Sequence, residues 1–293
     1  MKPTLFIIGA PKCGTTSLAY YLDQEPSICM SIPKEPKFFH TDFSEKHRYA
    51  LTLRDYERCF QHCSEKHQIA VESTVWYLFS EFAVPNILSY SPDAKFVVLL
   101  RDPVELVQAL HSQLVFGGDE AETDFSRAWY LQEARRNGHN LPPNCRDPKS
   151  LQYRKIALLG EQVHRLLGHV DASRVKFVRF SEIVANPLAV HQEIMRFAAL
   201  PSASVIDFAK KNENKVIRNK ALANLLFWGN RIKLKLGLKR SFSIWLTLQP
   251  IISRKMHRPQ ISDQMLKALR ESFEKDLELL RLETGIDLRE EWN

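Results

Sequence analysis

The feature that most constrains this chain is a short apolar run that ends in a glycine-containing turn close to its beginning. Residues 5–9 (LFIIG) have the composition of a buried strand. After the turn, Leu18, Tyr21 and Leu22 recur at helical spacing. A strand, a glycine turn and a helix in this order direct backbone N–H groups and the positive end of the helix at an anion. The sequence therefore predicts a phosphate-binding unit at the start of an α/β domain.

The rest of the chain alternates between strand-like and helix-like patterns. Further strands are predicted at 68–72, 95–100 and 175–180, and helices at 104–115, 161–168, 189–199 and 263–283. Strands that alternate with helices are typical of an α/β fold with a central, mostly parallel sheet and helices on both faces. Neither an internal repeat nor a low-complexity tract interrupts this pattern. One domain spanning residues 1–293 is therefore predicted.

The composition allows a packed core, since 44% of the residues are hydrophobic. The five cysteines are an odd number and lie far apart: Cys13, Cys29, Cys59, Cys63 and Cys145. This pattern favours free thiols in a reducing compartment over a disulfide framework. No run approaches the roughly 20 apolar residues that span a bilayer, and the first strand begins too early to leave room for a signal peptide. A cytoplasmic location is therefore predicted.

Positive charge is concentrated in one segment. Residues 210–258 contain thirteen Lys and Arg but a single acid, Glu213, which gives this segment a net charge of +12. Because the whole chain has a net charge of +7, the remaining residues carry −5. A basic segment on an acidic body indicates an anionic partner, whether nucleotide phosphates, an acidic substrate, a membrane surface or nucleic acid. Residues 212–258 are predicted to be helical and to form a lid. Within them, 221–252 interleave apolar and basic residues, and could be a lid, a peripheral membrane contact or a plain cover on the sheet.

The turn itself, Gly9-Ala-Pro-Lys12-Cys-Gly14-Thr15-Thr16, differs from the loop of nucleoside triphosphate enzymes. In the pattern G-x-x-x-x-G-K-[ST], the lysine directly follows the second glycine and reaches the β- and γ-phosphates. Here Thr15 stands in that position, and Lys12 precedes Gly14 instead. The N–H groups of residues 13–16 can still bind one phosphate. Lys12 is placed close to this phosphate, over the bond that the reaction would break.

This loop resembles the 5′-phosphosulfate loop of the sulfotransferases that use 3′-phosphoadenylyl sulfate (PAPS), in which the lysine precedes Gly-Thr-Thr. Four further segments resemble the family in the expected order: 34–39 (KEPKFF), 72–78 (ESTVWYL), 95–103 (KFVVLLRDP) and 177–201 (from FVRFSE through NP to FAALP). The resemblance covers residues 5–201, with a weaker match at 285–292. It implies a P-loop-like sulfotransferase fold, PAPS as the sulfuryl donor and its desulfated form, PAP, as the product. It also implies that no metal is required, because the sulfuryl group carries less charge than a phosphoryl group.

The resemblance assigns two catalytic roles. Lys12 would stabilise the departing phosphate, and Glu35, which stands where the family has its glutamate base, would take the proton from the acceptor. The family often has histidine where this chain has Lys37, and a cation there would lower the pKa of Glu35 and weaken it as a base. His40 is therefore a second candidate for part of this work.

The nucleotide site implied by the resemblance centres on the loop, with these members: Pro11, Lys12, Cys13, Gly14, Thr15, Thr16 and Ser17. Arg101 would bind the 3′-phosphate through its forked donors. The family has a serine eight residues later, where this chain has Ala109, and Ser112 lies about one helical turn further on. Tyr153 is predicted either to stack near the adenine or to lie in the core. Arg218 resembles a late basic element over the 3′-phosphate, or belongs to a solvated helix.

The acceptor is predicted to be a small molecule, a glycolipid or a saccharide that offers a hydroxyl or an amine. Lys37, Phe39, Glu72 and Ser73 are the candidate acceptor contacts. The acceptor pocket itself is expected in variable loops, at 41–66, 116–150 and 220–255. The sequence does not indicate which acceptor is used.

Two other functions compete with this interpretation. A P-loop kinase or NTPase would use Asp102 as a magnesium ligand, although the position of Lys12 argues against it. A nucleic-acid or membrane-binding module would use the basic segment, but no nucleic-acid motif is present, so no nucleic-acid partner is predicted. The set Cys59, His62, Cys63 and His67 has spacings that suggest a metal. It lacks paired C-x-x-C elements, and a structural or incidental role is favoured, so no metal site is predicted.

Overall fold

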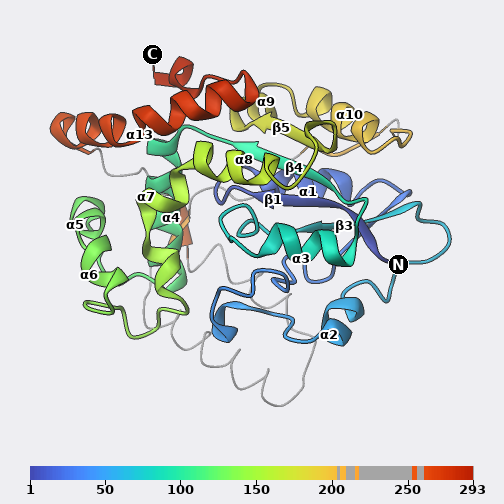
Figure 1. Ribbon diagram of the computed structural model, residues 1–293, viewed down its shortest axis with the longest axis horizontal. Helices are drawn as coiled ribbons and strands as arrows, with labels where there is room; N and C mark the ends of the chain where they lie inside the picture. The colour runs from blue at the N-terminus through green and yellow to red at the C-terminus, as the bar shows by residue number, and fades with distance from the viewer. Residues whose placement is uncertain (203–204, 209–214, 218–252, 256–260, 293) are drawn as a thin grey trace.

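The computed structural model describes residues 1–202, 205–208, 215–217, 253–255 and 261–292. Its centre is a five-stranded sheet in the order β2-β3-β1-β4-β5 (Figure 1). The strands are β1 (Pro3–Gly9), β2 (Ile28–Met30), β3 (Ile69–Ser73), β4 (Lys95–Leu100) and β5 (Val175–Arg179). All four neighbouring pairs are parallel. The predicted α/β fold with a parallel sheet is confirmed, and β2 is a strand that the sequence pattern did not indicate.

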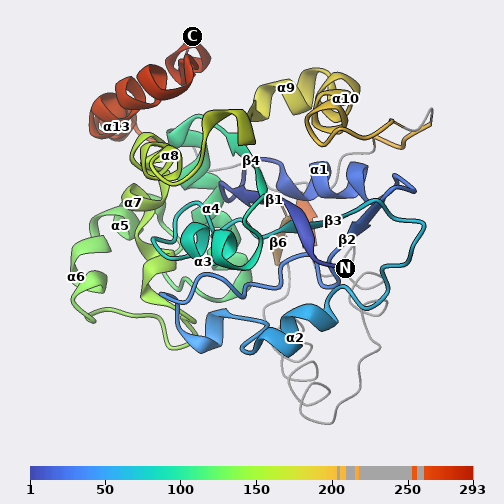
Figure 2. The same ribbon diagram turned by 45° about the vertical axis from the view of Figure 1, so that its right-hand side comes forward.

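The helices cover both faces of this sheet. They are α1 (Thr15–Leu22), α2 (Leu53–Arg58), α3 (Ala83–Tyr90), α4 (Pro103–Gly117), α5 (Phe125–Tyr130), α6 (Gln132–Arg136), α7 (Tyr153–Ala157), α8 (Leu159–Leu167), α9 (Phe180–Ala185), α10 (Pro187–Phe197) and α13 (Asp263–Thr284). Short 3₁₀ turns occupy η1 (Glu45–His47), η2 (Pro148–Leu151), η3 (Ala172–Arg174) and η4 (Leu288–Trp292). Two views place α3 and α8 on one face, and α1 and α10 on the other (Figures 1 and 2). Right-handed crossovers between parallel strands produce this arrangement.

Local sequence signals explain where the predicted helices begin and end. The side chain of Asp102 accepts a hydrogen bond from the backbone N–H of Glu105, and proline follows at the first position of α4. Asn186 caps α10 in the same way and is also followed by proline. α4 and α13 each end at a glycine, Gly118 and Gly285, whose left-handed backbone suits a helix terminus.

The long helix α13 forms an outer layer against α8. A side chain at Gly160 would collide with the backbone of Asp276, so the two helices approach as closely as glycine allows. The Asp276 carboxylate accepts from the N–H groups of Gly160 and Glu161, both at 2.8 Å, and so caps the start of α8. Burial raises the pKa of Asp276 to about 6. This contact fixes the C-terminal helix to the rest of the fold.

Where the structure describes the basic segment, its secondary structure differs from the predicted helix. Residues 215–217 and 253–255 are not helical but form two short antiparallel strands, β6 (Lys215–Ile217) and β7 (Ser253–Lys255). β6 lies close to α4. The predicted helix and lid between them, including the proposed membrane contact at 221–252, lie outside the described residues.

The prediction of five free thiols is wrong. Cys29 and Cys63 form a disulfide with their Cα atoms 5.6 Å apart, whereas Cys13, Cys59 and Cys145 are free. The physical reason is the position of β2, which brings Cys29 beside the segment after α2. Spacing along the chain gave no sign of this pair, which is separated by 34 residues. Among the described residues, no helix is both long and apolar enough to cross a bilayer.

Candidate active site

The loop between β1 and α1 has the backbone that its sequence requires. The N–H of Ala10 donates to the carbonyl of Leu99 at 2.9 Å, which fastens the loop to β4. Gly14 has a φ of 90°, and a Cβ atom there would lie 3.1 Å from the ring of Phe180 and 3.2 Å from Ile183. Glycine is therefore required at this position both for conformation and for space. Lys12 also adopts a left-handed backbone, with φ 67°.

The N-terminal end of α1 provides a place for an anion. The first N–H groups of a helix have no acceptor within it, and they carry the positive end of the helix dipole. Lys12, Thr16 and Ser17 are half-buried around this end, whereas Thr15 is buried. Pro11 and Cys13 are also buried, and burial raises the pKa of the Cys13 thiol to about 12, so that it stays neutral. The structure thus places both of these side chains in the interior.

Arg101, at the end of β4, lies against the same loop. Its Nη1 donates to the carbonyl of Lys12 at 2.8 Å, and the ring of Phe180 lies 4.2 Å from its Cζ atom. Its Nε donates to the carboxylate of Glu105 at 3.0 Å, so the two side chains form an ion pair. The structure thus brings together two segments that the sequence placed in one nucleotide site. Glu105 is a partner that the sequence interpretation missed, although its spacing of four residues on a helix was a signal for it.

The other predicted nucleotide contacts have different outcomes. Ser112 is half-buried on α4, and its hydroxyl donates to the carbonyl of Gln108 at 2.9 Å. Tyr153 is wholly buried, and its hydroxyl donates to Glu120 at 2.7 Å. Burial, together with the charge of Glu120, raises the pKa of Tyr153. The structure thus places Tyr153 in the core, the second of its two predicted positions, with its ring covered. Arg218 lies outside the described residues.

Glu35 lies between two lysines. Its carboxylate is 3.2 Å from Nζ of Lys34 and 3.5 Å from Nζ of Lys37, and its side chain is 28% exposed. Burial acts to raise the pKa of Glu35, but the charges of the two lysines outweigh it, so the pKa is below its ordinary value. This is the direction expected from the sequence. At neutral pH the group is an accessible carboxylate that can accept a proton.

A further cation approaches this carboxylate from a distant part of the chain. Arg146 is held by Asp119, with Nε 2.9 Å from Oδ1, and it interacts electrostatically with both Glu35 and Lys37. Burial lowers the pKa of Lys37, and the charge of Arg146 lowers it further. The pair of Arg146 and Asp119 was not predicted, since the two residues are 27 apart and share no local pattern.

Glu72, a predicted acceptor contact, lies in the interior of the protein. It is wholly buried at the end of β3, and its carboxylate accepts hydrogen bonds from Tyr56 at 2.6 Å and from Thr74 at 2.7 Å. The hydroxyl of Tyr77 is its third partner. Burial raises the pKa of Glu72 to about 7 despite these three hydrogen bonds. Ser73 is wholly buried beside it. The structure thus places both predicted acceptor contacts in the interior, with Tyr56 packed over Glu72.

The buried network around Glu72 holds the segment that carries Glu35. The Tyr77 oxygen accepts from the N–H groups of Phe38, at 3.0 Å, and of Phe39, at 3.3 Å. The Thr74 hydroxyl accepts from the N–H of Lys37 at 3.5 Å, where the backbone is left-handed with φ 53°. Three consecutive N–H groups of the segment are thus bound to side chains that are themselves held by one carboxylate. This arrangement fixes the backbone two residues after Glu35.

Two more predicted site residues lie in the interior. Phe39, a predicted acceptor contact, is 3% exposed and packs against the rings of Phe6, Tyr56 and Tyr77. His40 is wholly buried, with Nε2 3.1 Å from Nδ1 of His47. Burial lowers the pKa of His40 to about 3. The structure thus places this second candidate base in the interior, as a neutral imidazole.

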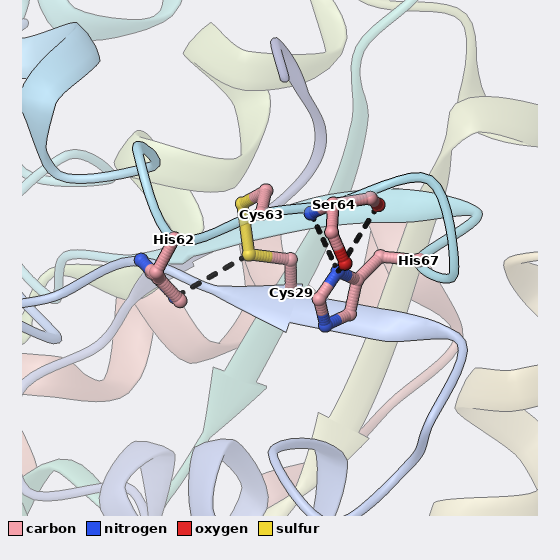
Figure 3. Close-up of a disulfide and its surroundings, with 5 residues drawn as sticks. All are labelled: Cys29, His62, Cys63, Ser64 and His67. Atoms are coloured by element: carbon pink, nitrogen blue, oxygen red, sulfur yellow. Dashed lines mark hydrogen bonds between the residues drawn. A yellow bond between two sulfur atoms is a disulfide. The ribbon is translucent and has the colours of Figure 1, made fainter.

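The four residues with metal-like spacings do not form one site. Cys63 is in the disulfide, and the Cys59 thiol lies 3.5 Å from the carbonyl of Asp55. His67 bonds to Ser64 within its own turn (Figure 3). His62 lies with Nε2 3.4 Å from Sγ of Cys29, which is not a member of the set. Helical spacing was misleading here because α2 ends at Arg58, before all four residues.

Comparison with known proteins gives one consistent result. The model of a family described as the sulfotransferase family matches residues 3–204. Bifunctional heparan sulfate N-deacetylase/N-sulfotransferase 4 of Mus musculus is 27% identical over 198 residues, which are 67% of this chain and 22% of that protein. Heparan sulfate glucosamine 3-O-sulfotransferase 3B1 of Mus musculus is 32% identical, covering 68% of this chain and 46% of that protein. The chain thus spans about a fifth of the bifunctional relative and about half of the other.

Solved structures agree. The sulfotransferase from Alicyclobacillus acidocaldarius is 27% identical, with a TM-score of 0.63, and the match covers 84% of this chain and 99% of that chain. Mouse sulfotransferase SULT7A1, complexed with PAP, is 11% identical with a TM-score of 0.55, over 100% of this chain and 89% of that chain. These similarities confirm the fold that the loop and its neighbouring segments predicted.

Proposed function

The chain belongs to the sulfotransferase family, and we propose that it transfers a sulfuryl group from PAPS to a hydroxyl or amine of a saccharide or small-molecule acceptor. The observation that carries the proposal is the meeting of three segments at one edge of the parallel sheet. The loop of Lys12 follows β1, Arg101 follows β4, and Glu35 follows β2 by a few residues. The carboxyl ends of parallel strands lie at the same edge, where α/β proteins bind their ligands.

The residues at this edge fit an adenosine nucleotide with phosphates at its 3′ and 5′ positions. The N–H groups at the start of α1 and the charge of Lys12 suit the 5′-phosphosulfate. Arg101, one segment away, suits the 3′-phosphate once its fork turns from Glu105 to the nucleotide. The loop is fastened to β4 through Ala10 and Leu99, and Arg101 is bound to the carbonyl of Lys12, so little order has to be gained on binding. PAP in the solved mouse sulfotransferase is in keeping with this assignment.

The chemistry requires a base, an aligned acceptor and a stabilised leaving group. Glu35 accepts the proton as the acceptor oxygen or nitrogen attacks sulfur, while the bond between sulfur and the bridging phosphate oxygen breaks. Lys12 neutralises the negative charge that develops on that phosphate. The low pKa of Glu35 keeps it ionised at neutral pH. Arg146 and Lys37 hold positive charge beside it and would attract an acceptor that carries negative groups.

A saccharide acceptor is supported by the relatives, two of which are named for heparan sulfate. The cations around Glu35 agree with an acidic saccharide. The competing kinase function receives no support, because Asp102, its magnesium ligand, instead caps α4 and accepts a hydrogen bond from Trp292. The predicted cytoplasmic location rested in part on free thiols, and the disulfide between Cys29 and Cys63 favours an oxidising compartment instead.

The test is turnover of labelled PAPS with heparan sulfate as acceptor, together with calorimetry of PAP binding. Lys12→Ala and Glu35→Gln should each lower kcat by about a hundredfold or more, since charge stabilisation and general base catalysis each contribute on that scale. PAP affinity should fall less for Lys12→Ala and stay unchanged for Glu35→Gln. Lys267→Ala and Glu271→Gln change exposed residues of the same types on α13, outside the loop and the expected acceptor segments, and should keep full activity. Binding of ATP with magnesium in place of PAP would refute the proposal.

A further inference from the structure

We propose that Cys29, Cys63 and His62 bind a zinc ion when the disulfide between the two cysteines is reduced. The ligand atoms of these three residues all lie within 4.8 Å of one another. Cys29 is buried, Cys63 is half-buried and His62 is exposed, so an ion could enter from solvent. Figure 3 shows the His62 ring directed at the sulfur of Cys29. Two thiolates and an imidazole are the ligand types that zinc prefers.

The distances suit a tetrahedral zinc site. Nε2 of His62 lies 3.4 Å from Sγ of Cys29. A tetrahedral zinc ion, with bonds of about 2.3 Å to sulfur and about 2.0 Å to nitrogen, requires about 3.5 Å between these two atoms. The two sulfur atoms must separate to about 3.8 Å by the same geometry. The Cα atoms of the cysteines are 5.6 Å apart, and rotation about the Cα–Cβ bonds provides this separation.

Contacts that do not involve the disulfide hold both sides of the site. Cys29 is paired with Ala70 in the parallel ladder between β2 and β3. The N–H of Ile32 donates to the carbonyl of Cys59 at 2.9 Å, and the N–H of Cys63 donates to the carbonyl of Phe60 at 3.0 Å. β2 and the segment after α2 thus remain side by side after reduction. The ligands would be presented to the ion without refolding.

The surroundings favour a cation and leave one ligand position open. Asp23, directly after α1, interacts electrostatically with His62 and adds negative charge near the site. His67 is kept away by its bond with the backbone N–H of Ser64 at 3.0 Å. The part of the chain that the structure describes therefore supplies three ligands, and water would complete the tetrahedron. This site is separate from sulfuryl transfer, for which no metal is invoked.

The two states of the site exclude each other. Two molecules of a small thiol give two electrons and two protons to the disulfide, which yields the Cys29 and Cys63 thiols and the disulfide of the reductant. Zinc then displaces the proton of each thiol, because the thiolate is the ligand. The oxidised chain has no thiolate to offer at this position. Zinc binding should therefore depend on the redox state of the protein.

The test is titration of the full chain with zinc chloride in a calorimeter, before and after reduction with a thiol that is then removed without air. Reduced protein should bind one zinc ion that oxidised protein does not bind. Cobalt in place of zinc should give the absorption bands of a tetrahedral ion with thiolate ligands. Absence of zinc binding by the reduced protein, or equal binding in both states, would overturn the proposal.

Single substitutions locate the site. Cys63→Ser and His62→Ala should each weaken zinc binding at least tenfold, and His62 is exposed, so its loss should not impair folding. Cys59→Ser, Cys145→Ser and His67→Ala are matched controls, because they remove the neighbouring thiols and imidazole that the geometry excludes. These three should bind zinc as the reduced wild type does. Loss of binding in any control, together with retention in His62→Ala, would assign the ion elsewhere and refute the site.

Discussion

The buried carboxyl group of Glu72 should make the stability of this protein fall as pH rises through neutrality. Burial raises its pKa from the ordinary value of 4.5 to about 7. The native state therefore binds this proton more tightly than the unfolded state does. Its contribution to stability is complete below about pH 4.5 and is lost as pH rises through 7. One pKa unit corresponds to about 1.4 kcal/mol, so the full effect is about 3 kcal/mol.

Glu72→Gln is the perturbation that tests this reasoning, because glutamine has nearly the same shape and does not ionise. Urea denaturation at intervals between pH 4.5 and 8.5 gives the free energy of unfolding of both proteins. The difference between variant and wild type should move in favour of the variant by about 3 kcal/mol as pH rises across this range. Asp276, whose pKa is also raised, is present in both proteins and cancels in the difference. A difference that does not change with pH would refute the reasoning.

Two further predictions concern groups that support the site. Tyr77→Phe removes the hydroxyl that accepts two backbone N–H groups, so it should lower the free energy of unfolding by about 1–3 kcal/mol and lower kcat without changing PAP affinity. Tyr153→Phe changes an equally buried tyrosine and should lose similar stability while it keeps kcat. Equal effects of the two substitutions on kcat would contradict the role of Tyr77. Glu105→Gln frees the guanidinium of Arg101, so calorimetry should show PAP binding that is up to about fivefold tighter, which is the scale of a partly exposed ion pair. Unchanged affinity would mean that Glu105 does not compete with the nucleotide.

The sheet and its main helices were predictable because their signals are local. The strands at 5–9 and 95–100 are continuous apolar runs, as expected for strands that are covered on both faces. Asp102 and Asn186, each followed by proline, marked where helices start. β2 was missed because three residues are too short for any periodicity. Its presence decides the pairing of Cys29, so the error about free thiols follows from the error about this strand.

The site was predicted only in part, because sequence position does not separate accessible residues from buried ones. Lys12 and Glu35 stand at the exposed edge, and the loop backbone has the form that the glycine pattern required. Glu72 stands at the end of a strand, where the sequence alone does not distinguish a buried carboxylate from a functional one. It is covered because Tyr56, which closes over it, belongs to α2, a helix whose position depends on the whole fold. Arg146 was missed for the same reason, since its anchor is distant in the chain.

The buried residues Glu72, Thr74 and Tyr77 stabilise the backbone turn that follows Glu35. A left-handed backbone at Lys37 is uncommon for a residue with a side chain and costs energy. It persists because Thr74 and Tyr77 bind the N–H groups of this turn, and Glu72 binds both hydroxyls. The turn directs Lys37 back toward Glu35, where its charge helps to keep the carboxylate ionised. The basicity of the proposed base is thus set partly by a carboxyl group that never meets the acceptor.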